Sequence, residues 1–84
     1  MTCLQLLSEF IAFKFPWWGV CHISFKHEIR TVYIYNENPS KRAIILRDAR
    51  EVARLDIGVD QFVIMQPGYS EIMIPMIANK DFKN

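Results

Sequence analysis

The 84-residue chain has few of the residues from which recognisable functional motifs are built. Its three glycines, at positions 19, 58 and 68, lie too far apart to form a phosphate-binding loop. Its two cysteines, Cys3 and Cys21, are too few for a disulfide framework and indicate reduced thiols in a cytoplasmic protein. No signal-peptide pattern and no run of about 18 apolar residues is present, so we expect neither secretion nor membrane insertion.

An excess of charge of either sign is also missing. Ten Lys and Arg side chains against nine Asp and Glu give a net charge of +1, which provides no overall field to attract nucleic acid or anionic membrane. The basic charge is local, because five of the ten cations fall between Lys41 and Arg54. The hydrophobic content of 51% predicts a folded chain, and its length predicts a single domain over residues 1–84.

Residues that could perform chemistry are sparse. Cys21, His22 and His27 are the one cluster with metal-ligand chemistry, but neighbours on a strand point to opposite faces and a fourth ligand is missing. No serine lies in a nucleophile elbow, and no third group is present to orient a Cys–His pair. We therefore expect a protein without enzymatic activity, metal or cofactor.

The longest regular pattern runs from Asn38 to Gly58 and predicts one amphipathic helix. Asn38 can cap it, Pro39 suits its first position, and Gly58 can end it. A competing interpretation starts the helix at Ala49 with Asp48 as its cap, which would make residues 43–46 a short strand.

The predicted helix has two different faces at 100° per residue. The apolar arc, which should face the core, contains Ile45, Leu46, Ala49, Val52 and Ala53. The opposite face carries Arg47, Arg50 and Arg54. A solvated outer face explains such a row most simply, and a contact surface for phosphates or an acidic partner protein is the sharper hypothesis.

The remaining patterns complete an α+β fold. Residues 2–14 predict a first helix with an unusually wide apolar sector, which indicates deep burial or a dimer seam. Strand patterns follow at residues 21–26 and 31–35, and again on both sides of Pro67-Gly68. The predicted order is αββαββ: two helices on one face of a four-stranded antiparallel sheet made of two hairpins. The last strand, with Pro75, should lie at an edge.

Three aromatic side chains are candidates for partner contacts. Trp17 and Trp18 follow the first helix, where a tryptophan most often packs at the rim of the core, but an exposed indole is a common binding anchor. Tyr69 lies at the predicted loop tip, where little core is available to it.

These residues lead to two hypotheses of different classes. The first is a small interaction protein that covers a surface of a larger protein or complex, with a homodimer as one form of the protein. Proteins of this kind are found among the inhibitor and accessory proteins of phages and mobile elements. Its contact residues would be Arg47, Arg50, Arg54, Trp17, Trp18 and Tyr69. The alternative is a nucleic-acid-binding protein in which the arginines contact phosphates and the aromatics stack on unpaired bases.

Overall fold

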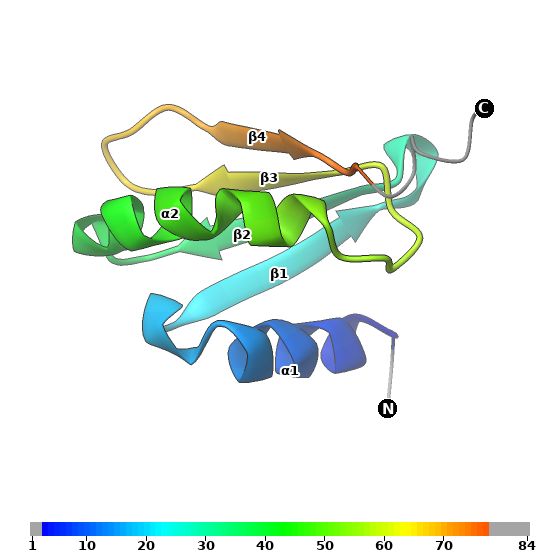
Figure 1. Cartoon of the computed structure of the whole chain (residues 1–84), viewed down its shortest axis with the longest axis horizontal. Coiled ribbons are helices and arrows are strands. Elements are labelled where there is room, and N and C mark those ends of the chain that lie inside the picture. Colours follow the sequence, from blue (N-terminus) through cyan, green and yellow to red (C-terminus); the bar gives the residue numbers. More distant parts are fainter. Residues whose placement is uncertain (1–2, 78–84) are drawn as a thin grey trace.

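The computed structural model describes residues 3–77 and contains two helices and a four-stranded sheet (Figure 1). The helices are α1 (Cys3–Lys14) and α2 (Arg42–Ala53). Single 3-10 turns, η1 (Pro16–Trp18), η2 (His27–Ile29) and η3 (Pro39–Lys41), join the larger elements. The strands are β1 (Cys21–Lys26), β2 (Thr31–Asn36), β3 (Gln61–Met65) and β4 (Ile72–Pro75). This confirms the α+β class and the order αββαββ.

The prediction of a fully antiparallel sheet is wrong, because the sheet is mixed. Its strand order is β1-β2-β3-β4, and the two hairpins β1–β2 and β3–β4 are antiparallel as expected. The central pair is parallel, with Val32 opposite Phe62 and Ile34 opposite Ile64. The reason is the connection between them: residues 37–60 contain α2, and a helix returns the chain to the level where β2 began. The third strand then runs in the same direction as the second.

One hydrophobic core lies between the sheet and both helices. It joins the inward side chains of α1 and α2 to alternate residues of every strand, among them Ile11, Ile34, Ile45, Phe62 and Ile74. Figure 1 shows α2 crossing in front of β2 and β3, with α1 alongside β1. No described element covers the opposite face of the sheet, where His22, Ser24 and Lys26 are exposed.

Helix α2 is a single unit, but it is shorter than predicted. The Asn38 side chain accepts a hydrogen bond of 3.0 Å from the backbone N–H of Ser40 and so caps η3, which leads directly into α2. The interpretation of residues 43–46 as a strand is therefore excluded. The helix ends at Ala53 and not near Gly58, because Leu55, Ile57 and Val59 pack against the core at a spacing of two, which suits extended chain.

The apolar arc of α2 also differs at one position. Leu46, predicted to face the core, is half exposed, whereas Ile44 packs against the core. Beyond the helices, β4 lies at a sheet edge as Pro75 predicted, and the β1–β2 turn falls at η2. Within residues 3–77, neither helix combines the length and the apolar character needed to cross a bilayer.

Candidate functional site

The candidate site is built where the turn after α1 meets the middle of α2. The backbone at η1 directs two adjacent indoles toward one carboxylate. The Nε1–H of Trp17 donates to Oδ2 of Asp48 at 2.6 Å, and the Nε1–H of Trp18 donates to the same oxygen at 2.9 Å. Two segments that lie about 30 residues apart in the sequence are therefore joined through a single side chain.

The two tryptophans differ in exposure and so in role. Trp18 is 0% exposed and stacks on Phe15 with 4.5 Å between ring centroids, so its indole forms part of the core. Trp17 is 43% exposed and meets the edge of Phe15 at 6.3 Å. The structure thus places Trp18 among the packing residues, and only Trp17 presents an indole at the surface.

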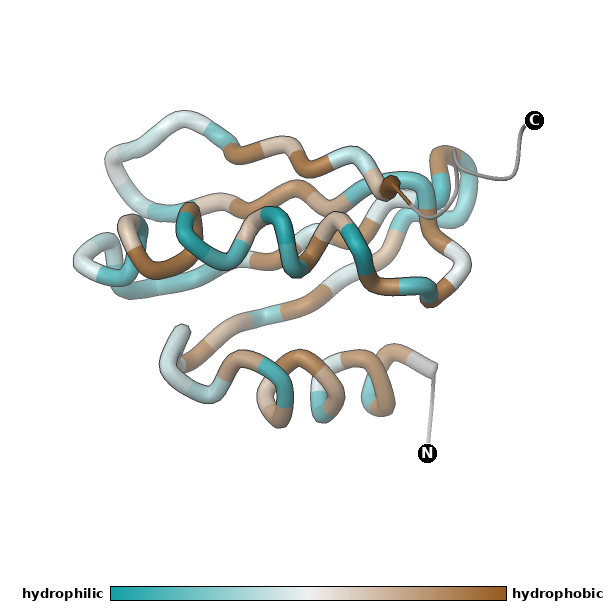
Figure 2. Tube along the Cα trace, viewed as in Figure 1, coloured by the Kyte–Doolittle hydropathy of each residue, from teal (hydrophilic) through white to brown (hydrophobic). Residues whose placement is uncertain are grey.

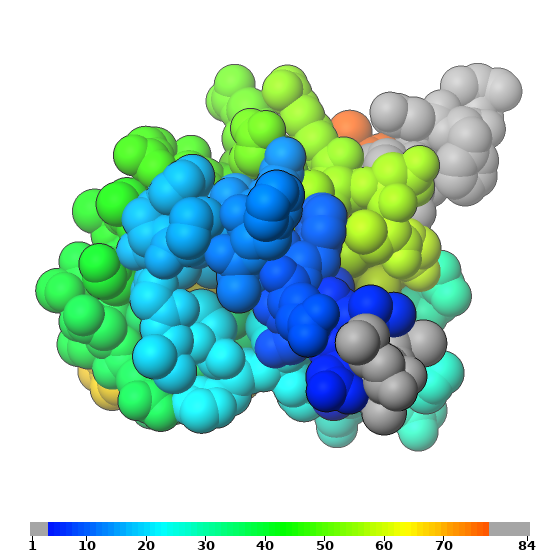
Figure 3. All heavy atoms as spheres, turned by 90° about the horizontal axis from the view of Figure 1, so that it is seen from below, coloured from blue at the N-terminus to red at the C-terminus, as the bar shows by residue number. Residues whose placement is uncertain are grey.

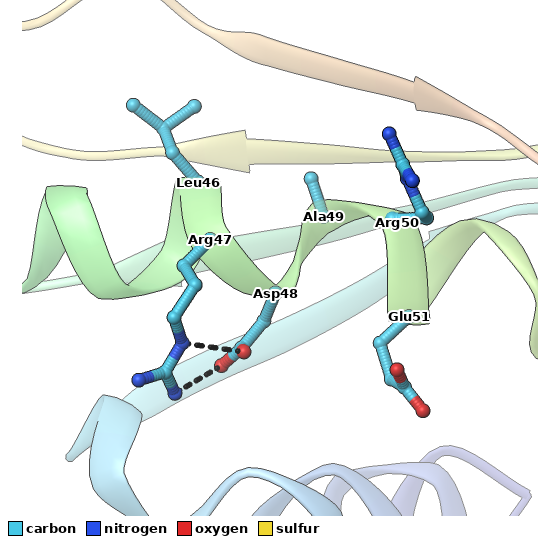
Figure 4. Close-up of a pocket in the computed structure, with 6 residues that line it drawn as sticks. All are labelled: Leu46, Arg47, Asp48, Ala49, Arg50 and Glu51. Carbon is cyan, nitrogen blue, oxygen red and sulfur yellow. Dashed lines mark hydrogen bonds and ion pairs between the residues drawn. The ribbon is translucent and has the colours of Figure 1, made fainter.

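Arg47 completes the cluster from the helix side. Its Nε donates to Oδ1 of Asp48 at 3.1 Å and its Nη2 to Oδ2 at 3.4 Å (Figure 4). The guanidinium carbon also lies 5.7 Å from the centroid of the Trp17 ring, within the range of a cation–π interaction. Arg47 is therefore held in place, with most of its side chain still accessible.

The surroundings of Asp48 keep it ionised. Partial burial raises the pKa of this carboxyl, but the hydrogen bonds from Trp17, Arg47 and Trp18 and the positive charge of Arg47 outweigh that effect. The net result is a pKa below the usual range for aspartate. The carboxylate can therefore accept all four hydrogen bonds at neutral pH.

The other two predicted arginines lie further along α2. Arg50 and Arg54 are exposed, and within residues 3–77 neither guanidinium makes a hydrogen bond or an ion pair. Figure 4 shows that Arg47 and Glu51 point to one side of the helix, whereas Leu46 and Arg50 point to the other. These side chains line a depression on the outer side of α2, with Arg47 and Arg50 on its two sides.

Tyr69 lies elsewhere, on the loop between β3 and β4. Its ring packs under the guanidinium of Arg42, at 4.4 Å from the centroid, and Arg42 also donates to the side-chain oxygen of Gln66 at 3.4 Å. The structure therefore brings Trp17 and Arg47 together and separates Tyr69 from them. Tyr69 remains half exposed above the first turn of α2.

Helix α1 adds a second surface that the sequence indicated only through its wide apolar sector. Leu7 and Ile11 face the core and Phe10 packs partly against it, while Leu6 and Phe13 extend the apolar stripe into the exposed surface. Phe13 is 83% exposed. The tube in Figure 2 is apolar along most of α1, and in the view from below α1 lies across the front of the molecule (Figure 3).

Apolar grooves flank this helix. One of about 590 Å³ runs between the first turns of α1 and the loop after α2, and is lined by Leu4, Leu6, Leu7, Phe25, His27, Ile57, Gly58 and Val59. A helix that is apolar on more than its buried face requires a second contact to cover it. Of the predicted helix over residues 2–14, the part from Leu4 to Lys14 is buried on one face only, so the alternative of deep burial holds for that face.

The side chains with metal-ligand chemistry are dispersed. Cys21 faces the core and accepts a contact of 3.3 Å from the Asn36 amide, and burial raises the pKa of its thiol. His22 faces the opposite side of the sheet, 2.6 Å from a carboxylate oxygen of Glu37. Across residues 3–77 no three His, Cys, Asp or Glu side chains come together in a way that could hold a metal ion.

The residue that the sequence interpretation missed is Asp48. Locally it resembles a helix cap or a surface charge, and no pattern within 30 residues connects it to the tryptophans. Comparison of the chain with protein-family models, curated protein sequences and solved structures gives no match.

Proposed function

We propose that this protein is a non-enzymatic binding module that docks on an acidic patch of a larger protein and covers it. The contact would be the arginine–tryptophan surface, which we define as Trp17, Leu46, Arg47, Arg50 and Arg54. Tryptophan and arginine are the residue types that most often dominate binding energy at protein interfaces. Leu46 adds an exposed apolar side chain on the same side of the helix as Arg50.

The observation that carries the proposal is the fixed position of an accessible indole. Trp17 is 43% exposed, yet its N–H is bonded to Asp48 and its ring lies beside Arg47. An anchor that is already ordered loses less conformational entropy on binding than a free side chain. Local stability does not require Arg50 and Arg54, because they repel each other weakly at a spacing of four.

The apolar stripe of α1 extends the same side of the molecule. Leu6 and Phe13 belong to the helix layer, as the arginines do, and are exposed, whereas Phe10 packs partly against the core. A partner with an acidic centre and an apolar margin would match both surfaces. Aromatic and arginine side chains together, with few lysines, are the composition typical of protein interfaces.

Single charge reversals test the proposal. Arg50→Glu and Arg54→Glu should each weaken capture of the cellular partner at least about tenfold, and the triple reversal with Arg47 should abolish it. Lys14→Glu is the matched control, since it makes the same change of charge on the exposed end of α1. Arginine and glutamate have similar helix propensities, so circular dichroism should show an intact fold. Capture that is unaffected by all three reversals would refute the proposal.

A second candidate is binding of single-stranded nucleic acid, favoured by the same three arginines beside an accessible indole. Of the two tryptophans only Trp17 could stack on a base, because Trp18 is buried. Asp48 and Glu51 lie among the arginines and reduce the local charge. Titration with oligonucleotides at low salt should quench Trp17 fluorescence if this function is correct, and the affinity should fall steeply as salt increases.

A further inference from the structure

The face of the sheet that carries no described helix is a further large surface of this molecule. Alternation along the strands places a defined set of side chains on it, which we call the open face: His22, Ser24, Lys26, Thr31, Tyr33, Tyr35, Gln61, Val63, Met65, Met73 and Pro75. Its centre is apolar and close-packed, since Val63 is 2% exposed although no described element covers it. Around it Tyr35 and Met73 are 38% and 59% exposed.

The strand register arranges these side chains in rows across the sheet. The middle row is Ser24, Tyr33, Val63 and Met73, and the row beside it is His22, Tyr35 and Met65. The His22 and Tyr35 rings lie 6.2 Å apart. Such a surface of aromatic, methionine and β-branched side chains resembles one inner face of a β-sandwich, which is normally covered by a second sheet.

Charge on this face is divided between its two ends. Lys26 lies at one end of β1, while Glu37 lies at the other end of the strands, where it pairs with His22 at 2.6 Å. A basic group at one end and an acidic group at the other make the face complementary to a reversed copy of itself. A nucleic acid would gain little here, because the lysine is matched by the glutamate.

From these observations we infer that a second copy of the chain covers the open face, forming a back-to-back dimer. The two-fold axis would run across the strands, so that the strands of the two sheets are antiparallel and Lys26 of each copy approaches Glu37 of the other. An axis along the strands would instead place β1 over β4, where Lys26 would meet the row of Gln61 and Pro75, which contains no carboxylate. The charges thus select one of the two symmetric arrangements.

The available area sets the expected strength of the dimer. Four strands spaced about 4.8 Å apart, each about five residues long at roughly 3.3 Å per residue, give a footprint of roughly 19 by 17 Å. Two such faces have a projected area of roughly 650 Å² in total, which the relief of their side chains increases, so the buried surface stays below about 1,200 Å², the low end of specific interfaces. We therefore expect a reversible dimer with a dissociation constant in the micromolar range.

The apolar stripe of α1 is a less suitable seam for two copies. Its midpoint, between Leu6 and Phe13, falls at Glu9, so a two-fold axis there would bring the Glu9 carboxylates of both copies together. Dimerisation through the sheets leaves both helix layers facing outward. It stands independently of the proposed function, and it would present two arginine–tryptophan surfaces on opposite sides of one particle.

Sedimentation equilibrium of the full chain tests the inference over about 1 to 500 µM, a range that brackets a micromolar dissociation constant. The mass should rise from 9.9 kDa toward twice that value. Tyr35→Glu and Met73→Glu should each leave a monomer throughout, and Arg50→Glu, on the helix layer, should dimerise as the wild type does. If the chain is still a monomer at the highest concentration, the inference is wrong and the open face would have to be covered by a different protein.

Exchanging the charges of Lys26 and Glu37 tests how the two sheets are oriented in the dimer. Both side chains are exposed, so the test does not depend on variants of the core, which can fold poorly. Lys26→Glu and Glu37→Lys should each raise the dissociation constant roughly tenfold. The double variant should return it to within about threefold of the wild type. The back-to-back arrangement would be wrong if the losses of dimer affinity add up in the double variant. It would also be wrong if neither Tyr35→Glu nor Met73→Glu changes the dissociation constant.

Discussion

The buried indole of Trp18 donates its N–H to Oδ2 of Asp48 at 2.9 Å, and this bond joins the turn after α1 to the middle of α2. Asp48 is the acceptor that the described residues provide for that N–H. Within residues 3–77 every buried polar side-chain atom has a hydrogen-bond partner. The Asp48 carboxylate therefore holds the helix layer together while it also positions the exposed indole of Trp17.

Asp48→Ala should lower the free energy of unfolding by about 2–3 kcal/mol, because it leaves the Trp18 N–H without its acceptor. Asp48→Asn keeps one amide oxygen as acceptor and should cost less, about 1 kcal/mol. Urea unfolding followed by circular dichroism measures both. Glu51→Ala, an exposed change on the same helix, should stay within about 0.5 kcal/mol. An Asp48→Ala variant as stable as the Glu51→Ala control would contradict this role.

Acid should weaken the same contact. The folded state lowers the pKa of Asp48, so ionised Asp48 contributes stability that is complete above the pKa of the unfolded chain, about 3.9. This contribution is lost as the pH falls through the lower pKa of the folded state. The difference in unfolding free energy between the wild type and Asp48→Asn should therefore shrink below about pH 4. A difference that is constant down to pH 2 would argue against the assignment.

The two tryptophans should respond differently to truncation. Trp18→Ala removes a fully buried indole and should cost about 3–5 kcal/mol of stability. Trp17→Ala removes a partly exposed one, so it should cost less than half as much while reducing partner capture. Parallel unfolding and capture measurements separate the two effects. Equal losses of stability would mean that Trp17 is also a core residue.

A buried amide network should be as important as the indole bonds. Asn36 donates to the backbone oxygen of Trp18 at 2.8 Å and accepts from Gln66 at 3.2 Å. Asn36→Ala leaves these groups unpaired in the interior and should cost about 2–4 kcal/mol, measured by urea unfolding. Ser24→Ala, on the exposed side of β1, is the control and should change stability little.

Tyr69 gives a prediction about the loop between β3 and β4. Tyr69→Ala removes its cation–π contact with Arg42 and should cost about 0.5–1 kcal/mol, as for an exposed pair. Hydrogen exchange of the loop amides should accelerate, while that of β2 should not change. Unaltered exchange in the loop would show that the ring contact does not order it.

Local sequence patterns determined the type and order of the elements. The 3.6-residue period marked α2, the alternation of Cys21, Ile23 and Phe25 marked β1, and Pro75 placed β4 at an edge. The cap at Asn38 could also be predicted from the sequence, because its hydrogen bond reaches only two residues along the chain. All these features depend on neighbours in the sequence, so the sequence contains them directly.

The tertiary structure alone decided which distant residues meet. The parallel pairing of β2 with β3 follows from how α2 carries the chain back, and no residue in either strand encodes it. Likewise, Trp17 and Asp48 are 31 positions apart, and their contact exists only because η1 and α2 pack against one core. Contacts of this kind depend on the whole chain burying its apolar surface at once, which no local pattern can specify.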